Sequence, residues 1–167
     1  MDEIINRVAN SKLVTFNLED YYPVGERVLI DIKDWLFEGF ILREKEFRAY
    51  VKKHSWEQYQ DCYAAIYCST DAIVPGWAYM LVQTHLQPHT KKVVQGNLEQ
   101  LETSLYQTVL ETLDVSEYAD KSVIIKGCSN KPVPPNAYLW ATSKIQTVAK
   151  SVMYGEACSA VPLYKRK

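Results

Sequence analysis

The stretch Cys62-Tyr-Ala-Ala-Ile-Tyr-Cys68, followed after a loop by Trp77-Ala-Tyr-Met-Leu-Val-Gln-Thr-His-Leu86, decides the fold class. The first run is short, apolar and bounded by polar residues, which is typical of a buried strand. The second run is apolar nearly all round, which indicates a buried helix, and Pro75 suits the first turn of that helix because its missing N–H costs nothing there. The stretch therefore predicts a strand followed by a helix, with both elements buried.

The same alternation continues toward the C-terminus. A short strand over residues 91–95 precedes a helix over 97–113, and a strand over 122–126 precedes a helix over 136–154. Repeated strand–helix alternation favours an α/β fold with a mostly parallel sheet and flanking helices. Upstream, residues 12–16 and 27–32 have the pattern of two more strands, and an antiparallel pairing of these two at an edge of the sheet is one option. With no internal repeat and no linker apparent, we expect a single α/β domain over residues 1–167.

Several signals mark the ends of the predicted helices. Asn97 and Gln100 have the spacing of a capping box at the start of the 97–113 helix. Asp71 is expected to cap the buried helix that follows it, although a role as an acid in a site is the alternative. Asn136 is expected to cap the last helix, and Gly155 to end it. Two more helices are predicted, a short amphipathic one over residues 2–10 and a surface helix over residues 41–53.

Composition bounds the class of partner and the compartment. The net charge of −1 gives no reason to expect nucleic acid or an anionic membrane as a partner. The N-terminus lacks the apolar core of a signal peptide, and no stretch is long and apolar enough to span a membrane, so we expect a cytoplasmic protein with reduced cysteines. The chain has 12 Tyr and 4 Trp. A surface rich in these rings would suit a protein partner or a homo-oligomer.

The cysteines are the least ordinary chemistry in the sequence. Cys68 and Cys128 each follow a predicted strand, where ligands bind in parallel α/β sheets, and Cys158 follows Gly155. With Asp71 and His85, these thiols would make a set of ligands suited to zinc or iron. The alternative is that the cysteines are inert core residues.

A catalytic thiol is a third option. Lys126 and Lys131 flank Cys128 and would favour its thiolate, but no histidine lies nearby in the sequence. The sequence contains no phosphate-binding glycine loop and no zincin or hydrolase motif. We therefore favour a non-catalytic role.

Four runs carry a resemblance to a known family. They are Phe37-Glu-Gly-Phe-Ile-Leu-Arg-Glu-Lys-Glu-Phe47, Cys68-Ser-Thr-Asp-Ala-Ile-Val-Pro-Gly-Trp-Ala-Tyr79, Lys126-Gly-Cys128 and Met153-Tyr-Gly-Glu-Ala-Cys-Ser159. Together they resemble the bacterial domain of unknown function family 2480, over essentially the whole chain. The resemblance assigns no activity, substrate or catalytic residue, and it implies an accessory role connected with iron–sulfur cluster assembly.

The predicted last helix makes a Cys128–Cys158 site depend on geometry. A straight helix over residues 136–154 would be about 28 Å long at ~1.5 Å per residue and would run back along the sheet. Cys128 and Cys158 would then lie at opposite ends of the sheet, unless the helix is short or broken or the Pro-rich segment 129–135 first runs the length of the sheet. Close sulfurs would indicate a site, and distant sulfurs two separate packing residues.

Overall fold

The computed structural model describes residues 13–127 and 130–167, whose contacts divide the chain into two compact units. Unit 1 comprises Met1–Pro23 and Leu105–Lys167, and unit 2 comprises Val24–Ser104. Each unit has its own sheet and its own apolar core. Whether the two units act as one domain over residues 1–167 stays a prediction.

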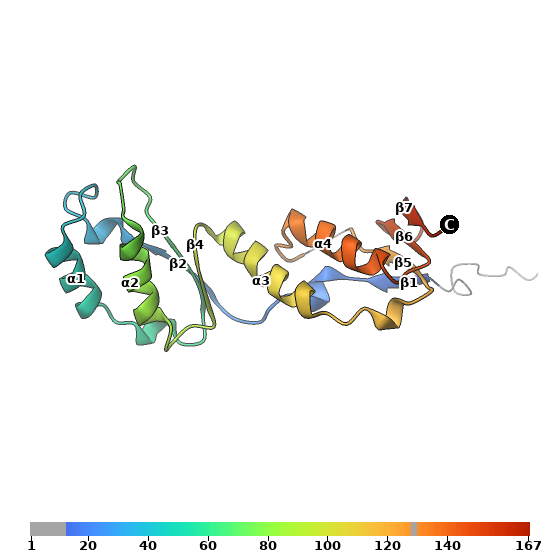
Figure 1. The fold of residues 1–167 in the computed structure, drawn as a ribbon, viewed down its shortest axis with the longest axis horizontal. Coiled ribbons are helices and arrows are strands. Elements are labelled where there is room, and N and C mark those ends of the chain that lie inside the picture. The colour runs from blue at the N-terminus through green and yellow to red at the C-terminus, as the bar shows by residue number, and fades with distance from the viewer. Residues whose placement is uncertain (1–12, 128–129) are drawn as a thin grey trace, which may run out of the picture. The chain divides into compact units, whose positions relative to one another are not determined.

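Unit 2 is built on a three-stranded parallel sheet in the order β2-β3-β4. The strands are Arg27–Asp31, Tyr63–Tyr67 and Lys92–Gln95, and the helices α1 and α2 span Glu44–Lys53 and Gly76–Leu86. Both helices pack on one face of the sheet, because alternate strand residues and the apolar stripes of both helices share one core (Figure 1). The short helices η2 (Ile32–Trp35) and η3 (Glu57–Tyr59) add Ile32 and Tyr59 to this core.

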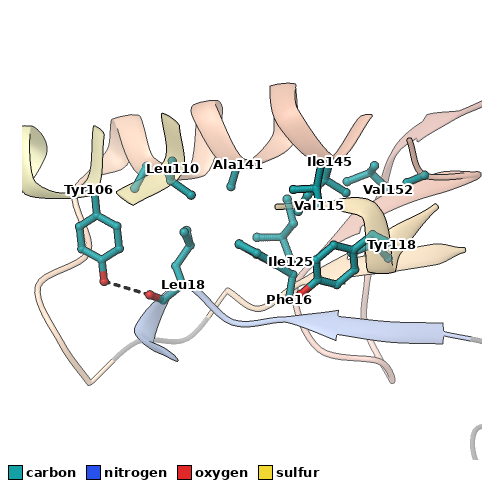
Figure 2. Packing of buried hydrophobic residues seen from close by; sticks show 13 residues of the cluster. Phe16, Leu18, Tyr106, Leu110, Val115, Tyr118, Ile125, Ala141, Ile145 and Val152 are labelled. Atoms are coloured by element: carbon teal, nitrogen blue, oxygen red, sulfur yellow. Dashed lines mark hydrogen bonds between the residues drawn. The ribbon is translucent and has the colours of Figure 1, made fainter. Parts of the chain in front are cut away.

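Unit 1 has four strands in the order β1-β5-β6-β7, of which the first three are parallel. The strands are Leu13–Phe16, Ser122–Ile125, Ser151–Tyr154 and Val161–Lys165. Helix α4 (Pro135–Gln146) covers one face, together with the second half of α3 (Leu98–Thr112), whose first half belongs to unit 2. The short helices η1 (Leu18–Tyr21) and η4 (Ser116–Tyr118) complete the unit. Figure 2 shows Ala141 and Ile145 of α4 facing Ile125 of the sheet.

The predicted fold class is confirmed, since the sheets are mostly parallel, flanked by helices, and include one antiparallel pair. The antiparallel pair, however, is β6–β7 at the C-terminus. The proposed pairing of the first two strands is wrong, because β1 pairs with β5 and β2 pairs with β3, both in parallel. A side-chain pattern alone identifies a strand but does not identify its neighbour.

The predicted helix over residues 136–154 is wrong after Gln146. Helix α4 ends at Gln146, and residues Ser151–Tyr154 form strand β6, paired with β5. Val148 and Val152 fit a helical spacing, but the β5 backbone offers hydrogen bonds that a longer helix would forgo. Lys150 N donates to Lys121 O (2.8 Å), and Gly155 N donates to Ile125 O (3.0 Å), at the two ends of this pairing. Gly155 therefore lies at the same edge of the sheet as the end of β5.

The two units repeat one module, which corrects the expectation that the chain has no internal repeat. Strands β3 and β4 of unit 2 correspond to β5 and β6 of unit 1, helix α2 corresponds to α4, and η3 to η4. Each helix and strand of unit 2 from α1 to β4 has its counterpart 59 positions later in the chain. The strand registers agree as well, because Tyr63↔Lys92 becomes Ser122↔Ser151.

Details of the backbone follow the same interval. Asp61 and Asp120 both have left-handed backbone angles, with φ of 60° and 58°. Asp61 N donates to His89 O, and Asp120 N donates to Val148 O, which is the corresponding carbonyl. Several residues are identical between the units: Tyr59 and Tyr118, Val74 and Val133, Pro75 and Pro134, Ala78 and Ala137, Tyr79 and Tyr138, and Gly96 and Gly155.

The predicted helix signals had mixed outcomes. The capping box is confirmed, because Gln100 N donates to Asn97 Oδ1 and Asn97 N donates to Gln100 Oε1, both at 2.8 Å. The capping roles of Asp71 and Asn136 are wrong, since Pro75 and Pro134 precede the first turns of α2 and α4. The predicted helix over residues 2–10 lies outside the described residues. Over the described ranges, no helix is long and apolar enough to cross a membrane.

Candidate functional site

The candidate site lies where the parallel strands of unit 2 end, which is the usual place for a ligand in such a sheet. Asp31 is the last residue of β2, and its Oδ1 accepts hydrogen bonds from Lys33 N (3.0 Å) and Ser69 N (3.2 Å). Burial by itself would raise the pKa of Asp31, but hydrogen bonds from Ser69 and Lys33, with the Lys33 charge, outweigh it and lower this pKa. Asp31 therefore fastens the loop after β3 to the end of β2.

A second hydrogen bond fastens that loop to the loop before α1. Thr70 Oγ1 donates to Gly39 O at 2.6 Å, and Cys68 Sγ lies 3.3 Å from Thr70 Oγ1. Because the Thr70 hydroxyl proton is committed to Gly39, the Cys68 thiol is the donor in this contact. Gly39 takes the left-handed conformation, with φ of 77°, that a side chain would disfavour. The Cys68 thiol thus belongs to a hydrogen-bonded chain between two loops.

Tyr79 completes the polar part of the site from the first turn of α2. Burial raises the pKa of the Tyr79 hydroxyl, and negative charge on Cys68 and Asp31 would raise it further. The phenol is therefore held in its protonated form, as a hydrogen-bond donor.

Exposed apolar side chains surround this polar cluster, and we call them the loop surface. Phe40 and Ile41 lie on the loop before α1, Ile73 on the loop after β3, and Met80 at the end of the first turn of α2, with exposures of 57%, 53%, 93% and 70%. Both loops project on the same side of unit 2 (Figure 1). Soluble proteins leave single apolar residues exposed, but several of them together at a sheet edge mark a contact surface.

The residues predicted to bind metal do not gather in unit 2. Cys68 belongs to the loop junction, and Asp71 is exposed on the same loop. His85 lies in the last turn of α2, at the other end of that helix, and its ring stacks on Trp56 at 5.3 Å. Nowhere in the described ranges do three or more His, Cys, Asp or Glu side chains form a group that could hold a metal ion. Zinc or iron binding stays a prediction without structural support.

The corresponding edge of unit 1 carries the other predicted ligands. Cys158 is exposed in the turn after β6, and Cys128 lies outside the described residues. Because β6 replaces the end of the predicted helix, the opposite-ends argument no longer holds. Gly127 and Gly155 follow adjacent parallel strands, and Tyr154 Oη donates to Gly127 O at 3.4 Å. The Cys128–Cys158 distance itself stays untested.

Glu19 in unit 1 has the same structural role as Asp31 in unit 2, since its carboxylate holds the loop after a neighbouring strand. Its Oε1 accepts hydrogen bonds from Asn130 N and from Lys131 N, the latter at 3.0 Å. In both units, a carboxylate at the end of the first strand or just after it thus holds the loop that follows the second strand.

The thiol of Cys62, the residue before β3, is not activated for nucleophilic catalysis. Cys62 is buried, and burial raises the pKa of its thiol, with the charges of Glu26 and Asp61 adding to the effect. A raised pKa keeps the thiol protonated and therefore a poor nucleophile at neutral pH.

An aromatic cluster around His54 was missed by the sequence analysis. The imidazole packs against Trp35 (5.1 Å), Trp56 (4.7 Å) and Tyr59 (5.6 Å), and its Nε2 lies 2.7 Å from Tyr59 Oη. No sequence motif marks this cluster, because its members come from η2, the end of α1 and η3. The only available signal was the high density of aromatic residues between positions 35 and 59.

His54 should make unit 2 sensitive to acid. Burial lowers the pKa of its imidazole below the usual 6.5. As the pH falls below 6.5, the unfolded chain takes up a proton before the folded one, so the free energy of unfolding decreases until the pH passes the folded pKa. An NMR titration is expected to show the His54 ring protons titrating below pH 6.5 in the folded protein. A folded-state pKa at or above 6.5 would contradict this prediction.

The fold and the site define a class: a parallel α/β protein of two repeated units, with an apolar loop surface on one of them. The chain belongs to the family described as Protein of unknown function (DUF2480), whose model matches residues 2–166. This confirms the resemblance found in the sequence. No curated protein and no solved structure matches the chain.

Proposed function

We propose that the protein is a non-catalytic binding module, and that unit 2 binds a partner protein through the loop surface. The partner segment would carry apolar side chains flanked by lysine or arginine. The main support for this proposal is the exposure of Phe40, Ile41 and Ile73 on two loops that the Thr70–Gly39 hydrogen bond joins.

The energetic argument rests on apolar area left in water. Burying a side chain such as isoleucine or phenylalanine contributes about 1.5–3 kcal/mol relative to leaving it exposed. Ile73 is 93% exposed, so nearly all of the free energy of burying its side chain is available to a partner. Three such side chains would give enough favourable energy to offset a substantial part of the cost of association.

The loops are held in place before a partner arrives, which lowers that cost. Phe37 and Ile41 exchange backbone hydrogen bonds at 2.7 and 3.0 Å, and the Arg43 guanidinium lies 3.4 Å from the centre of the Phe37 ring. Asp31 and Thr70 fasten the second loop. A preorganised surface loses little conformational entropy on binding.

Charge supports a basic partner. Asp34, Glu38 and Asp71 are exposed on or next to the two loops. None of the ion pairs found among the described residues involves these three carboxylates. Lysine or arginine beside the apolar residues of the partner would complement them and favour the correct encounter.

The repeat shows that this surface is particular to unit 2. The repeated interval begins at α1, so the loop before α1, which carries Phe40 and Ile41, has no copy in it: the residues 59 positions later, Glu99 and Gln100 of α3, belong to unit 2 itself. Ile73 corresponds to Pro132. The packing of the module does not need these apolar side chains, since the other copy is built without them.

Photo-crosslinking tests the proposal. The crosslinker p-benzoylphenylalanine would replace Phe40 or Ile73 in the full chain expressed in its source cells. Tyr50, exposed on α1 of the same unit, would be the control position. We expect Phe40 and Ile73 to crosslink to the same apolar, basic peptide of one partner, and Tyr50 not to do so.

The substitution Ile73→Asp then separates binding from folding. It should reduce the crosslink yield at Phe40 by about tenfold or more, equivalent to ~1.4 kcal/mol of binding energy, while the free energy of unfolding changes little because the side chain is exposed. Crosslinking to a second copy of the chain, to an acidic peptide, or equally from Tyr50 would contradict the proposal.

A further inference from the structure

Because the two units share one design, the chain must place the right strand, β1 or β2, in each of them. Strands β1 and β2 come one after the other, and each can be the first strand of a module. Leu13 of β1 faces Ser122, whereas Arg27 of β2 faces Tyr63, and Ser122 and Tyr63 are corresponding residues. The two strands therefore occupy the same place in two sheets of the same design.

Their apolar residues distinguish them only weakly. Val14 and Phe16 of β1 point into the core of unit 1, as Val28 and Ile30 of β2 do in unit 2. Cores accept apolar residues of roughly similar size with limited penalties. The sheet faces opposite these cores differ far more.

In unit 2 the opposite face holds a buried ion pair. Arg27 Nε donates to Glu102 Oε1 at 2.6 Å, and Arg27 Nη2 donates to Glu102 Oε2 at 3.2 Å. The side chains are only 12% and 8% exposed. Arg27 also donates to Gly25 O (2.7 Å) and lies over the ring of Tyr63 (5.1 Å). Such a bidentate pair requires the fixed geometry of a guanidinium, so in a buried setting it depends strongly on which residue occupies position 27.

We infer that the Arg27–Glu102 pair selects β2, rather than β1, as the first strand of unit 2. If β1 took this place, Leu13 would lie where Arg27 lies, and the Glu102 carboxylate would remain buried without its guanidinium. In unit 1, the corresponding row is Leu13, Ser122 and Ser151, which provides no carboxylate for Arg27. The pair thus penalises the exchanged arrangement in both units, which is the best-attested use of a buried polar pair.

The test moves the charge from one strand to the other in the full chain. The variant Leu13→Arg/Arg27→Leu gives β1 the guanidinium and leaves Glu102 in place. Methyl NOE contacts report the pairing: Val28–Ala64 and Val14–Val123 in the native arrangement, and Val14–Ala64 and Val28–Val123 in the exchanged one. We expect the exchanged contacts to predominate in this variant.

A second variant removes the pair altogether. Arg27→Leu/Glu102→Leu leaves no buried charge, so it is expected to fold and to show both sets of contacts, with the minor set above about 10% of the molecules. The control Glu44→Leu/Arg48→Leu, an exposed pair on α1 of the same unit, should show the native set only. Native contacts alone in both test variants, or a charge-swapped variant that does not fold, would overturn the inference.

Discussion

Replacing Glu102 by alanine is expected to lower the free energy of unfolding by about 3–5 kcal/mol, because the change leaves the Arg27 guanidinium buried without its carboxylate. Glu102 is 6% exposed, and the side chain of Arg27 is only 12% exposed. Gly25 O and the Tyr63 ring, which Arg27 also contacts, do not carry a formal charge. Urea unfolding of the full chain, followed by far-UV circular dichroism, measures the change.

Glu99 provides the matched control on the same helix. It lies three residues earlier in α3 and is exposed. Glu99→Ala should cost less than about 1 kcal/mol, chiefly through the lost interaction with the N-terminal end of the helix dipole. If Glu102→Ala and Glu99→Ala cost the same, the Arg27–Glu102 pair does not have the buried, unscreened character that its geometry indicates.

The individual elements of the fold could be read from the sequence, but their partners could not. Alternating and continuous apolar runs identified β1 to β5, helical spacing identified α1 and α3, and a longer run that is apolar nearly all round identified α2. The prediction for residues Ser151–Tyr154 was wrong because the spacing of Val148 and Val152 fits both a helix and a strand. Pairing with β5, which lies elsewhere in the sequence, decides in favour of the strand. Tertiary hydrogen bonds therefore outweighed local periodicity.

The repeat was hidden for a related reason. The two copies share burial and register more than residue identity, and a shared pattern such as Val-Pro-x-x-Ala-Tyr is short. The first strand of unit 1 also stands apart from the rest of its unit, with the whole of unit 2 inserted between them. A search for adjacent repeats in the sequence would not join these pieces.

The candidate site divides in the same way. The rule that ligands bind at the carboxyl ends of parallel strands indicates the loop that starts at Cys68, and this loop does follow strand β3. The partners of that loop, Asp31 and Gly39, come from a different part of the chain, and no spacing in the sequence indicates them. The cysteines drew attention as possible metal ligands, whereas the structure gives Cys68 a hydrogen-bonding role between two loops.

Comparison of the two units separates what the module needs from what one copy adds. Both units fasten the loop after their second strand with a carboxylate, Asp31 or Glu19, so this contact serves the fold. Met80 and Leu139, which also correspond, are exposed in both, at 70% and 67%. Phe40 and Ile41 have no counterparts in unit 1, and Ile73 is replaced there by the smaller Pro132. These three residues are therefore the ones whose exposure the fold leaves unexplained, and the binding proposal rests on them.

Removing the Tyr106 side chain from the core of unit 1 should be as damaging as removing Glu102 from unit 2. Tyr106 is fully buried, and its hydroxyl donates to Leu18 O at 3.0 Å (Figure 2). Tyr106→Ala deletes a large ring that the surrounding side chains can replace only in part, so a loss of about 3–5 kcal/mol in the free energy of unfolding is expected. Thermal and urea unfolding of the full chain would measure it.

The substitution Tyr106→Phe separates the ring from its hydrogen bond. Phenylalanine is sterically suited to this position, because the corresponding residue of unit 2 is Phe47, which is also fully buried. Tyr106→Phe removes the hydrogen bond to Leu18 O and should cost about 0.5–1.5 kcal/mol, the usual net value of such a bond. If Tyr106→Phe were as destabilising as Tyr106→Ala, the hydroxyl rather than the ring would hold η1 against α3, and the correspondence of Tyr106 with Phe47 would not extend to their packing.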